Sequence, residues 1–497
     1  MSSSPLLAPE EEVLSTLRAD GHRNWLHPKV AVGAWFQKRR VVGWFLIALF
    51  NALPWLRMNG KPMVLLDWIG RKFHLFGITF EISDAFLLAL LGLIWMLGIF
   101  AVTALLGRVW CGWMCPQTIY LEFVYRPLER LCFGRVGVGG KPAHVAACRR
   151  LLLWALYAIV SLWLAHVFLA YFVGVDRLLG LRGHEGWVRR SPLDHPGGFF
   201  LIGFVTVAMV FDFAFWREQL CTLACPYGRF QSVLLDRFSP VVAYDALRGE
   251  PRGKPRKEKK VALPLLAATA PSGGDCVDCG MCLAVCPTGI DIRKGLQMEC
   301  LHCTQCVDAC DKTMDHFGRP RGLIRYATGA TLAGEKKRWL RPRVVLYPMA
   351  IALFSALFLH NLANKTGVGM YARRAAGTSY RMLADGRVEN SFEVEVVNRT
   401  EERRVCAVRF DGLAGALWQA DGLGEKEPPV VLAPEETRKF YIRVQVPPTV
   451  FGHVLPVMDL TLDDGQGRPQ SEKMRLLGPS SVAPAVSSVP IPSPPAP

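Results

Sequence analysis

The chain has 497 residues, of which 51% are hydrophobic, and its mean hydropathy is +0.22. Such a length predicts several domains, and such an apolar balance favours a protein partly embedded in lipid over a soluble enzyme. Many of the Lys and Arg residues behind the net charge of +16 flank apolar runs, so we expect a lipid membrane and no nucleic acid as partner.

Apolar stretches of spanning length set the predicted membrane region. Residues 1–40 are polar, of mixed charge and without a signal-peptide pattern. A spanning helix needs about 20 mostly apolar residues. Five stretches reach or approach this length, at about 41–56, 85–106, 151–175, 197–215 and 343–363. The first is short and ends at Pro54, and the fourth holds Asp212 near its end, where an interfacial position is favoured and an internal role stays open.

Basic residues predict the orientation of these spans. They are dense before the first span, between the second and third spans, and in the run from Arg248 to Lys260. The positive-inside rule places all three segments in the cytoplasm. The outer loops, at about 57–84 and 176–196, also hold basic residues, so the contrast is moderate. Five crossings that start inside leave the C-terminus on the other side of the membrane.

Two short cysteine motifs follow the second and the fourth predicted spans. They read CGWMCP at 111–116 and CTLACP at 221–226, so a unit of two spans plus C-x3-C-P is repeated. On an α-helix, residues i and i+4 share a face, which predicts two sulfur atoms on one side in each motif. The candidate thiols are Cys111, Cys115, Cys221 and Cys225. They are interpreted as soft-metal ligands, above all for Cu(I), or as redox-active dithiols.

Eight of the 15 cysteines lie within residues 276–310. The strings CVDCGMCLAVCP at 276–287 and CLHCTQCVDACD at 300–311 share the spacing C-x2-C-x2-C-x3-C. Three cysteines at steps of three wrap a loop around one [4Fe–4S] cluster, and the fourth usually ligates the neighbouring cluster. The spacing therefore predicts two clusters. Their ligands are Cys276, Cys279, Cys282 and Cys310 for the first, and Cys300, Cys303, Cys306 and Cys286 for the second.

Zinc is the main competing metal for these cysteines, but a zinc site needs only four ligands and does not explain two complete repeats. A disulfide scaffold is excluded by the reducing compartment that the orientation predicts.

Two departures from the ferredoxin pattern stand out. Only 13 residues separate Cys286 from Cys300, and Asp311 takes the place that Pro287 has in the first motif.

The segment after the last predicted span changes character. Strings such as FEVEVV at 392–397 and FYIRVQV at 440–446 alternate or are β-branched, which predicts an all-β sandwich. Cys132, Cys148 and Cys406 have no partner in a motif and are interpreted as structural, and Met114 as packing. The predicted organisation is an N-terminal segment (1–40), a four-helix membrane region (41–247), a basic and Pro/Ala-rich linker (248–275), a small α+β two-cluster ferredoxin-like module (276–342), a fifth membrane helix (343–363), the β domain (370–478) and a disordered tail (479–497).

Together these motifs resemble the cytochrome c oxidase accessory protein family CcoG, also called FixG or RdxA. The resemblance rests on GRKFHLFG at 70–77, CGWMCPQT at 111–118, CPYGRFQS at 225–232, the two cluster motifs and the β-rich C-terminal part. It implies a multi-pass protein of the bacterial inner membrane with a five-helix bundle. It also implies cytoplasmic clusters and a periplasmic immunoglobulin-like domain.

The resemblance also implies an activity. Family members are linked to assembly of cbb-type cytochrome c oxidase through reduction of Cu(II) to Cu(I). On this interpretation the chain is an electron-transfer oxidoreductase that takes electrons from a cytosolic donor, and the four C-x3-C-P cysteines hold or reduce copper. Copper chaperones or oxidase subunits would be its partners. Two alternatives stay open: a quinol-linked electron conduit to a respiratory partner, and an assembly scaffold with structural clusters.

Overall fold

The computed structural model describes most of the chain: residues 22–23, 25–68, 70–81, 84–134, 146–181, 193, 196–253, 274–336, 341–400, 402–411, 413, 415–421, 429–434, 436–451, 455–465 and 469–479. The chain forms two compact units, Met1–His360 and Asn361–Pro497. Most of the predicted linker and nearly all of the predicted tail lie outside the described residues.

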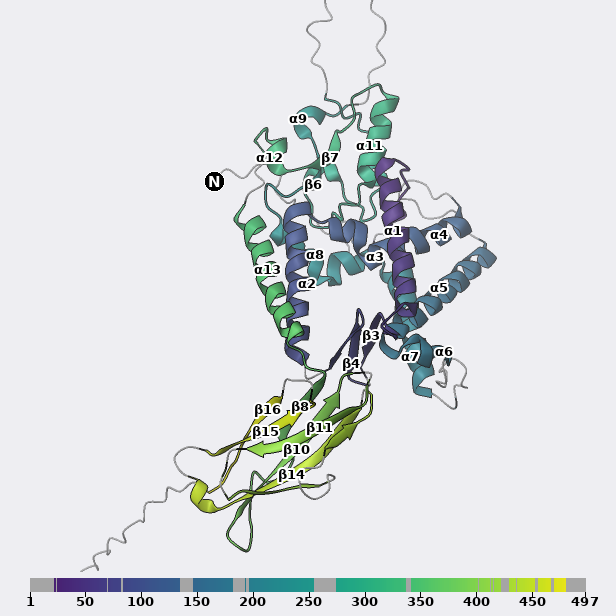
Figure 1. Cartoon of the computed structure of the whole chain (residues 1–497). Helices are drawn as coiled ribbons and strands as arrows, with labels where there is room; N and C mark the ends of the chain where they lie inside the picture. Colours follow the sequence, from purple (N-terminus) through teal and green to yellow (C-terminus); the bar gives the residue numbers. More distant parts are fainter. Residues whose placement is uncertain are drawn as a thin grey trace, which may run out of the picture. The chain divides into compact units, whose positions relative to one another are not determined.

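Four helices in the described part of the chain are long and apolar enough to cross a membrane. They are α2 (Ala85–Leu106), α5 (Ala147–Val173), α7 (Pro196–Val210) with its π-helical continuation η7 (Phe211–Trp216), and α13 (Pro342–Ala363). α2 and α13 lie side by side (Figure 1), and the ring centroids of Phe100 and Tyr347 are 6.4 Å apart between them. None of the residues of α13 is buried, as expected where lipid rather than protein covers an apolar helix. These four helices agree closely with the second to fifth predicted spans.

The first predicted span falls on the helix α1 (Ala34–Ala52). α1 begins before the predicted span and carries Lys38, Arg39 and Arg40 in its first half, so it is not among the four apolar helices. It ends in the 3-10 turn η2 (Leu53–Trp55), which contains Pro54, a residue without the N–H group that would continue the helix. A fifth crossing therefore stays a prediction.

Short strands fill the segment between α1 and α2. β1 (Arg57–Met58) pairs with β2 (Lys61–Pro62). β3 (Val64–Asp67), β4 (Lys72–Leu75) and β5 (Ile78–Glu81) form an antiparallel meander. The segment GRKFHLFG thus includes β4 and the turn that follows it.

Short helical segments join the long helices near the two C-x3-C-P motifs. Between α2 and α5 these are η4 (Trp110–Met114), α3 (Pro116–Tyr120), η5 (Leu121–Tyr125) and α4 (Arg126–Phe133). After α5 comes α6 (Val175–Leu179), and after η7 come η8 (Leu220–Ala224) and α8 (Pro226–Leu234).

The cysteine-rich segment folds around a two-stranded sheet. β6 (Val241–Tyr244) pairs antiparallel with β7 (Ile324–Ala327), with Val241 opposite Ala327. The other elements are α9 (Ala246–Gly249), α10 (Met281–Ala284), η10 (Ile292–Lys294), α11 (Gln305–His316) and α12 (Gly329–Leu332). In Figure 1 these elements gather beyond one end of α1 and α2. The strand β6 precedes the predicted linker, so residues from both sides of that linker build this small core.

The second unit is a two-sheet β structure. One sheet has the order β12-β14-β10-β8, with β9 paired to β10, and the other has the order β13-β11-β15-β16. The strands are β8 (Val368–Arg374), β9 (Arg381–Met382), β10 (Val388–Asn398), β11 (Arg404–Asp411), β12 (Leu417–Asp421), β13 (Val430–Leu432), β14 (Thr437–Val446), β15 (Val457–Asp463) and β16 (Gln470–Arg475), and the 3-10 turn η11 (Pro448–Val450) follows β14.

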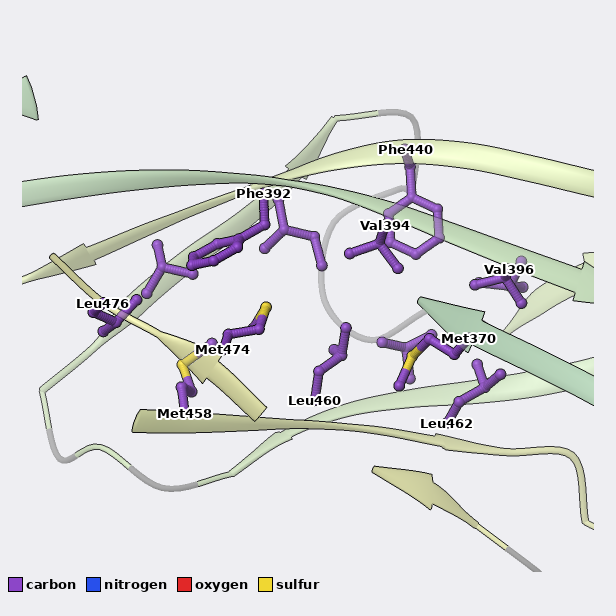
Figure 2. Packing of buried hydrophobic residues seen from close by; sticks show 14 of the residues in the cluster. Met370, Phe392, Val394, Val396, Phe440, Met458, Leu460, Leu462, Met474 and Leu476 are labelled. Atoms are coloured by element: carbon purple, nitrogen blue, oxygen red, sulfur yellow. The ribbon is translucent and has the colours of Figure 1, made fainter. Parts of the chain in front are cut away.

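The core of this unit lies between the two sheets. Figure 2 shows Phe392 and Val394 of β10 and Phe440 of β14 facing Leu460 and Leu462 of β15. Buried and partly exposed residues alternate along β10 from Val388 to Val396, which explains why its sequence pattern predicts a strand with one buried face.

Candidate functional site

The two cysteine-rich loops have the same backbone path. Two positions after the first cysteine of each loop, Asp278 (φ 48°) and His302 (φ 54°) are left-handed. Four positions after it, Gly280 (φ 66°) and Thr304 (φ 64°) are left-handed as well. Left-handed non-glycine residues are uncommon, and a β-branched one such as Thr304 is a genuine outlier. Because these conformations recur at matching positions, the two loops follow the same backbone path and can surround bound groups of the same shape.

A helix follows each loop, and its length depends on one residue. α10 has four residues and ends before Pro287, whereas α11 has 12 residues and runs through Asp311. Proline cannot donate the N–H bond that would extend the first helix. Asp311 instead accepts a hydrogen bond from the backbone N–H of Gly322 (2.9 Å). The exchange of proline for aspartate therefore lengthens the second helix.

The eight cysteines of the loops line two cavities. One cavity is bordered by Cys276, Cys279, Cys282 and Cys310. The other is bordered by Cys286, Cys300, Cys303 and Cys306, together with Cys282, which touches both. In each cavity the fourth cysteine comes from the other loop, which is the exchange that the motif spacing predicts.

The donor set fits iron–sulfur clusters better than zinc. A zinc ion holds thiolates at about 2.3 Å, which places their sulfur atoms about 3.8 Å apart. Among the described residues, no three His, Cys, Asp or Glu side chains are grouped to hold a single metal ion. Four thiols around a cavity suit a polynuclear cluster, in which each sulfur binds a different iron.

Burial makes these thiols unfavourable as free thiolates. It raises the pKa of Cys282 and of Cys303 to about 11, and the pKa of Cys300 and of Cys310 to about 12. A buried thiolate needs a compensating positive charge. Bound iron would supply that charge, so the environment of the cysteines agrees with a metal-cluster site.

The two C-x3-C-P motifs lie on π-helical turns, and the α-helical geometry predicted for them is wrong. The N–H of Cys115 donates to the carbonyl of Trp110 (2.8 Å), and the N–H of Cys225 donates to that of Leu220 (2.8 Å). Both cysteines then leave the helical region, with ψ of 125° and 108°. The cause is the proline that follows each of them, because it forces the preceding residue into an extended conformation.

The thiols of the two motifs influence one another electrostatically, and Cys111 and Cys221 pack in one group. Burial raises the pKa of Cys111 to about 11; Arg108 opposes this rise, and charge on Cys115 and Cys225 adds to it. Burial, together with the same neighbouring thiols, also raises the pKa of Cys221. Such thiols are protonated at neutral pH, so binding a cation releases a proton.

The first C-x3-C-P motif packs directly on the second cysteine-rich loop. Cys111, Leu301 and Cys303 form one buried group, against which Cys221 and Tyr227 also pack. The approach is so close that a Cβ atom on Gly112 would lie 2.4 Å from the carbonyl oxygen of Leu301. We call Cys111, Cys115, Cys221 and Cys225 the membrane-edge thiols. One of them, Cys111, lies in the same buried group as Cys303, which lines the second cavity.

A buried polar network fixes this contact. The Cys111 thiol donates to Oε1 of Gln231 (2.8 Å), and the guanidinium of Arg108 donates to the same oxygen (3.4 Å). Arg108 also donates to the carbonyl of Gly228 (3.1 Å), and its backbone N–H donates to Nδ1 of His302 (3.3 Å). Nε2 of His302 has no hydrogen-bond partner among the described residues, and the remaining bonds of this buried network favour one geometry.

Asp212 takes part in a second polar contact at the motif. Its Oδ1 accepts a hydrogen bond from Nε2 of Gln117 (3.0 Å), which also donates to the carbonyl of Arg217 (3.2 Å). Gln117 lies two residues after Cys115, so Asp212 helps to position the first motif. Its carboxylate is therefore hydrogen-bonded within the protein and does not simply face the membrane interface.

Comparison with known proteins supplies the family. Residues 216–329 match a family described as "4Fe-4S dicluster domain", residues 88–134 one described as "4Fe-4S binding domain", and residues 358–479 one described as "IG-like fold at C-terminal of FixG". Protein RdxA of Cereibacter sphaeroides is 32% identical over 494 residues, which cover 94% of this chain and 96% of that protein. Nitrogen fixation protein FixG of Rhizobium meliloti is 30% identical over 443 residues, with 80% and 82% covered. The chain belongs to the FixG/RdxA family.

A solved structure, that of a FixG-related protein from Vibrio parahaemolyticus, aligns with 24% of this chain and 100% of its own, at 16% identity and a TM-score of 0.20. The family and its matched regions identify this FixG/RdxA member as an iron–sulfur electron-transfer protein. Its four apolar helices indicate a membrane protein.

The structure also shows residues of this FixG/RdxA member that sequence reasoning missed. Arg39 is 1% exposed, and its Nε donates to the carbonyl of Gly112 (2.5 Å). Asp308 of α11 accepts hydrogen bonds from the backbone N–H groups of Trp35 (3.1 Å) and Phe36 (2.7 Å), so it caps α1 from another element. The only sequence signal was indirect, because Asp308 lies between two cluster cysteines.

The remaining single cysteines differ in their surroundings. Cys132 is buried beside α5, and Cys406 is buried in the core of the β unit. Cys148 is exposed at the start of α5. Met114 is 40% exposed, so it does not fill a core position as expected.

Proposed function

We propose that this FixG/RdxA-family protein transfers single electrons to Cu(II), producing Cu(I) for assembly of a cbb-type cytochrome c oxidase. The observation that carries the proposal is the packing of Cys111 on Leu301 and Cys303, with Cys221 against the same group. Thiolates favour Cu(I). A soft-metal donor set therefore lies beside the cysteines of an electron-transfer module.

We assign the cysteines by the cavities that they line. Cys276, Cys279, Cys282 and Cys310 hold one cluster, and Cys286, Cys300, Cys303 and Cys306 hold the other. Each bound cluster supplies one-electron transfer. The chain provides the contact between the second cavity and the first C-x3-C-P motif, because residues 301–303 line that cavity and pack on the motif.

Copper is a substrate in this proposal. A substrate ion that leaves after reduction does not need a preformed site with many ligands. In the described part of the chain, no three His, Cys, Asp or Glu side chains are grouped to hold a metal ion. Cys111, Cys115, Cys221 and Cys225 bind Cu(II), one electron converts it to Cu(I), and the ion passes to an acceptor. The electron comes from a cytosolic donor, and the acceptor is a copper chaperone or an oxidase subunit.

The topology of the proposal follows the charge pattern. The N-terminus and the clusters face the cytoplasm of a bacterial inner membrane, and the immunoglobulin-like β domain faces the periplasm. A cytoplasmic position keeps the cluster cysteines in a reducing compartment. The β domain then contacts the partners on the other side.

A copper-reduction assay tests the activity. Protein in lipid nanodiscs is reduced, freed of excess reductant and mixed with Cu(II) and a Cu(I)-specific chelator. We expect about two Cu(I) per chain, one electron from each cluster. A Cys111→Ser, Cys225→Ser double variant should lose most of this yield, whereas the exposed Cys148→Ser control should keep it. Fully reduced wild-type protein that produces no Cu(I) would refute the proposal.

The match of residues 88–134 to a "4Fe-4S binding domain" favours one competing occupant for the membrane-edge thiols. That region contains Cys111 and Cys115, so iron could bind there in place of copper. Iron analysis separates the two: about eight iron atoms per chain agree with two clusters, and about 12 would assign a third cluster to the C-x3-C-P motifs.

A further inference from the structure

A cavity of about 420 Å³ lies between α4 and the segment that precedes α1. Its volume falls in the range of small-molecule sites, about 300–1,000 Å³. It is separate from the two cysteine-lined cavities, and the proposed electron transfer does not use it. The residues that line it are His27, Pro28, Lys29, Val30, Val32, Arg126, Glu129 and Arg130.

The charges of the cavity favour an anion. Three lining residues, Lys29, Arg126 and Arg130, are cationic, and Glu129 is the single carboxylate. Glu129 is already engaged, because Arg217 donates to its two oxygens (3.3 and 3.1 Å) and Nδ1 of His27 lies 3.3 Å from it. Glu122 and Glu218 pair with Arg126 outside the lining, so the positive charge that the cavity offers a ligand comes mainly from Lys29 and Arg130.

The two arginines of the cavity differ in how accessible their donors are. Arg126 is 2% exposed, and its Nη atoms are engaged by Glu122, Glu218 and the carbonyl of Pro287. Its Nε, like Nη2 of Arg130, is buried without a hydrogen-bond partner among the described residues. Nη2 of Arg130 lies 3.6 Å from the nearest Glu122 oxygen. These two buried atoms lie out of reach of a ligand, but the Arg130 side chain as a whole is 33% exposed and pairs only with Glu122 among the described residues, so its other donors can reach an anion in the cavity.

We propose that this cavity binds an organic phosphate. Its phosphate group would accept from Arg130 and pair with Lys29, since guanidinium and ammonium groups are the common phosphate partners. The cavity is too large for inorganic phosphate alone. Its apolar wall of Pro28, Val30 and Val32 suits an organic body attached to the phosphate.

The cavity shares a wall with the second cysteine-lined cavity. Arg126 donates to the carbonyl of Pro287 (3.2 Å), and the backbone N–H of Lys29 donates to the carbonyl of Ala284 (2.9 Å). Next to Lys29, Ala31 packs in one group with Cys306. A bound anion would stabilise the more positive, oxidised state of a cluster held there. By linkage, reduction of that cluster would weaken binding of the anion.

Calorimetry with phenyl phosphate tests the proposal, using the full chain in nanodiscs of phosphatidylcholine. We expect phenyl phosphate to bind at least about tenfold more tightly than the neutral benzyl alcohol. Arg130→Gln and Lys29→Gln should each weaken it about tenfold. Both side chains are partly exposed, so their loss should spare the fold, as cluster absorbance will verify. Arg40→Gln removes the same charge from the exposed face of α1 and should leave the affinity unchanged.

The lipid composition identifies the source of the phosphate. If nanodiscs with phosphatidylglycerol weaken binding of phenyl phosphate, the natural ligand is a lipid headgroup; if they do not, it is a soluble phosphate ester. Equal affinities of wild-type, Arg130→Gln and Lys29→Gln protein would overturn the proposal, as would equal affinities for phenyl phosphate and benzyl alcohol. Copper reduction plays no part in this measurement, so its outcome is independent of the proposed activity.

Discussion

Substituting Gly112 by alanine tests the contact on which the proposed electron transfer depends. The new Cβ would lie 2.4 Å from the carbonyl oxygen of Leu301 and 3.0 Å from the carbonyl carbon and oxygen of His302. All three are backbone atoms that cannot rotate away. An ordinary contact is longer than 3.4 Å, so the motif and the loop must separate by about 1 Å. Overpacking of this kind costs about 1–3 kcal/mol.

We therefore expect Gly112→Ala to lower the melting temperature and to slow the formation of Cu(I), while both clusters stay bound. Thermal melts followed by cluster absorbance measure the first effect, and stopped-flow mixing of reduced protein with Cu(II) measures the second. Gly98→Ala is the matched control, because its Cβ would meet nothing within 4 Å and alanine is the better helix former by up to about 1 kcal/mol. Gly112→Ala protein as stable and as fast as wild type would refute the close contact.

Three further changes probe other parts of the site. Asp308→Ala should cost about 1–2 kcal/mol of stability, because α1 loses the acceptor for two of its first N–H groups; Asp315→Ala, which removes only an exposed ion pair with Arg321, is the control and should cost clearly less. Glu129 has its pKa lowered from 4.5 to about 2, because its hydrogen bond with His27 and the charge of Arg217 outweigh the opposing effect of burial. Since the folded state holds the depressed pKa, this carboxylate stabilises the protein above pH 4.5 and loses its effect as the pH falls toward 2. Melts of wild-type and Glu129→Gln protein should thus differ by about 3 kcal/mol at pH 7 and converge in acid, and a gap independent of pH would contradict the pairing. Cys279→Ser and Cys306→Ser should each leave about four iron atoms per chain. Only Cys306→Ser should abolish copper reduction by chemically reduced protein, because Cys306 lines the cavity next to the membrane-edge thiols. Equal losses in the two variants would argue against electron transfer to copper from the second cluster.

Much of this architecture was visible in the sequence because its signals are local. The run of apolar residues that forms α2 defines both ends of the helix, since Asp84 precedes it and Gly107 follows it. Alternation along 388–396 predicts a strand whose buried face can be read residue by residue. The cysteine spacing places the members of each loop, because steps of three fix how the backbone must turn.

The rest depends on contacts between residues far apart in the chain. The extended conformation of Cys115 and Cys225 could have been anticipated from Pro116 and Pro226, whose effect on the preceding residue is local. No local pattern, however, brings Asp308 to the start of α1, or His27 to Glu129. Arg39 looked like one of several orienting charges, and only its hydrogen bond with Gly112 shows why it is buried. Charges that a sequence assigns to a surface can be structural once tertiary contacts form.

The pairing of β6 with β7 has a consequence for the evolution of this architecture. The polypeptide enters the cysteine-rich part along Val241–Tyr244 and leaves it along Ile324–Ala327, and these strands run antiparallel. Entry and exit points are thus neighbours, as in domains that have been inserted into a host protein. The segment between the two strands could be exchanged for another redox cassette only if the replacement keeps the contacts of Asp308 with α1 and of Leu301 with Gly112, whereas the connecting segment could be lengthened freely. A chimaera that joins a foreign two-cluster unit at these strands and keeps those two contacts should insert into membranes as the parent does.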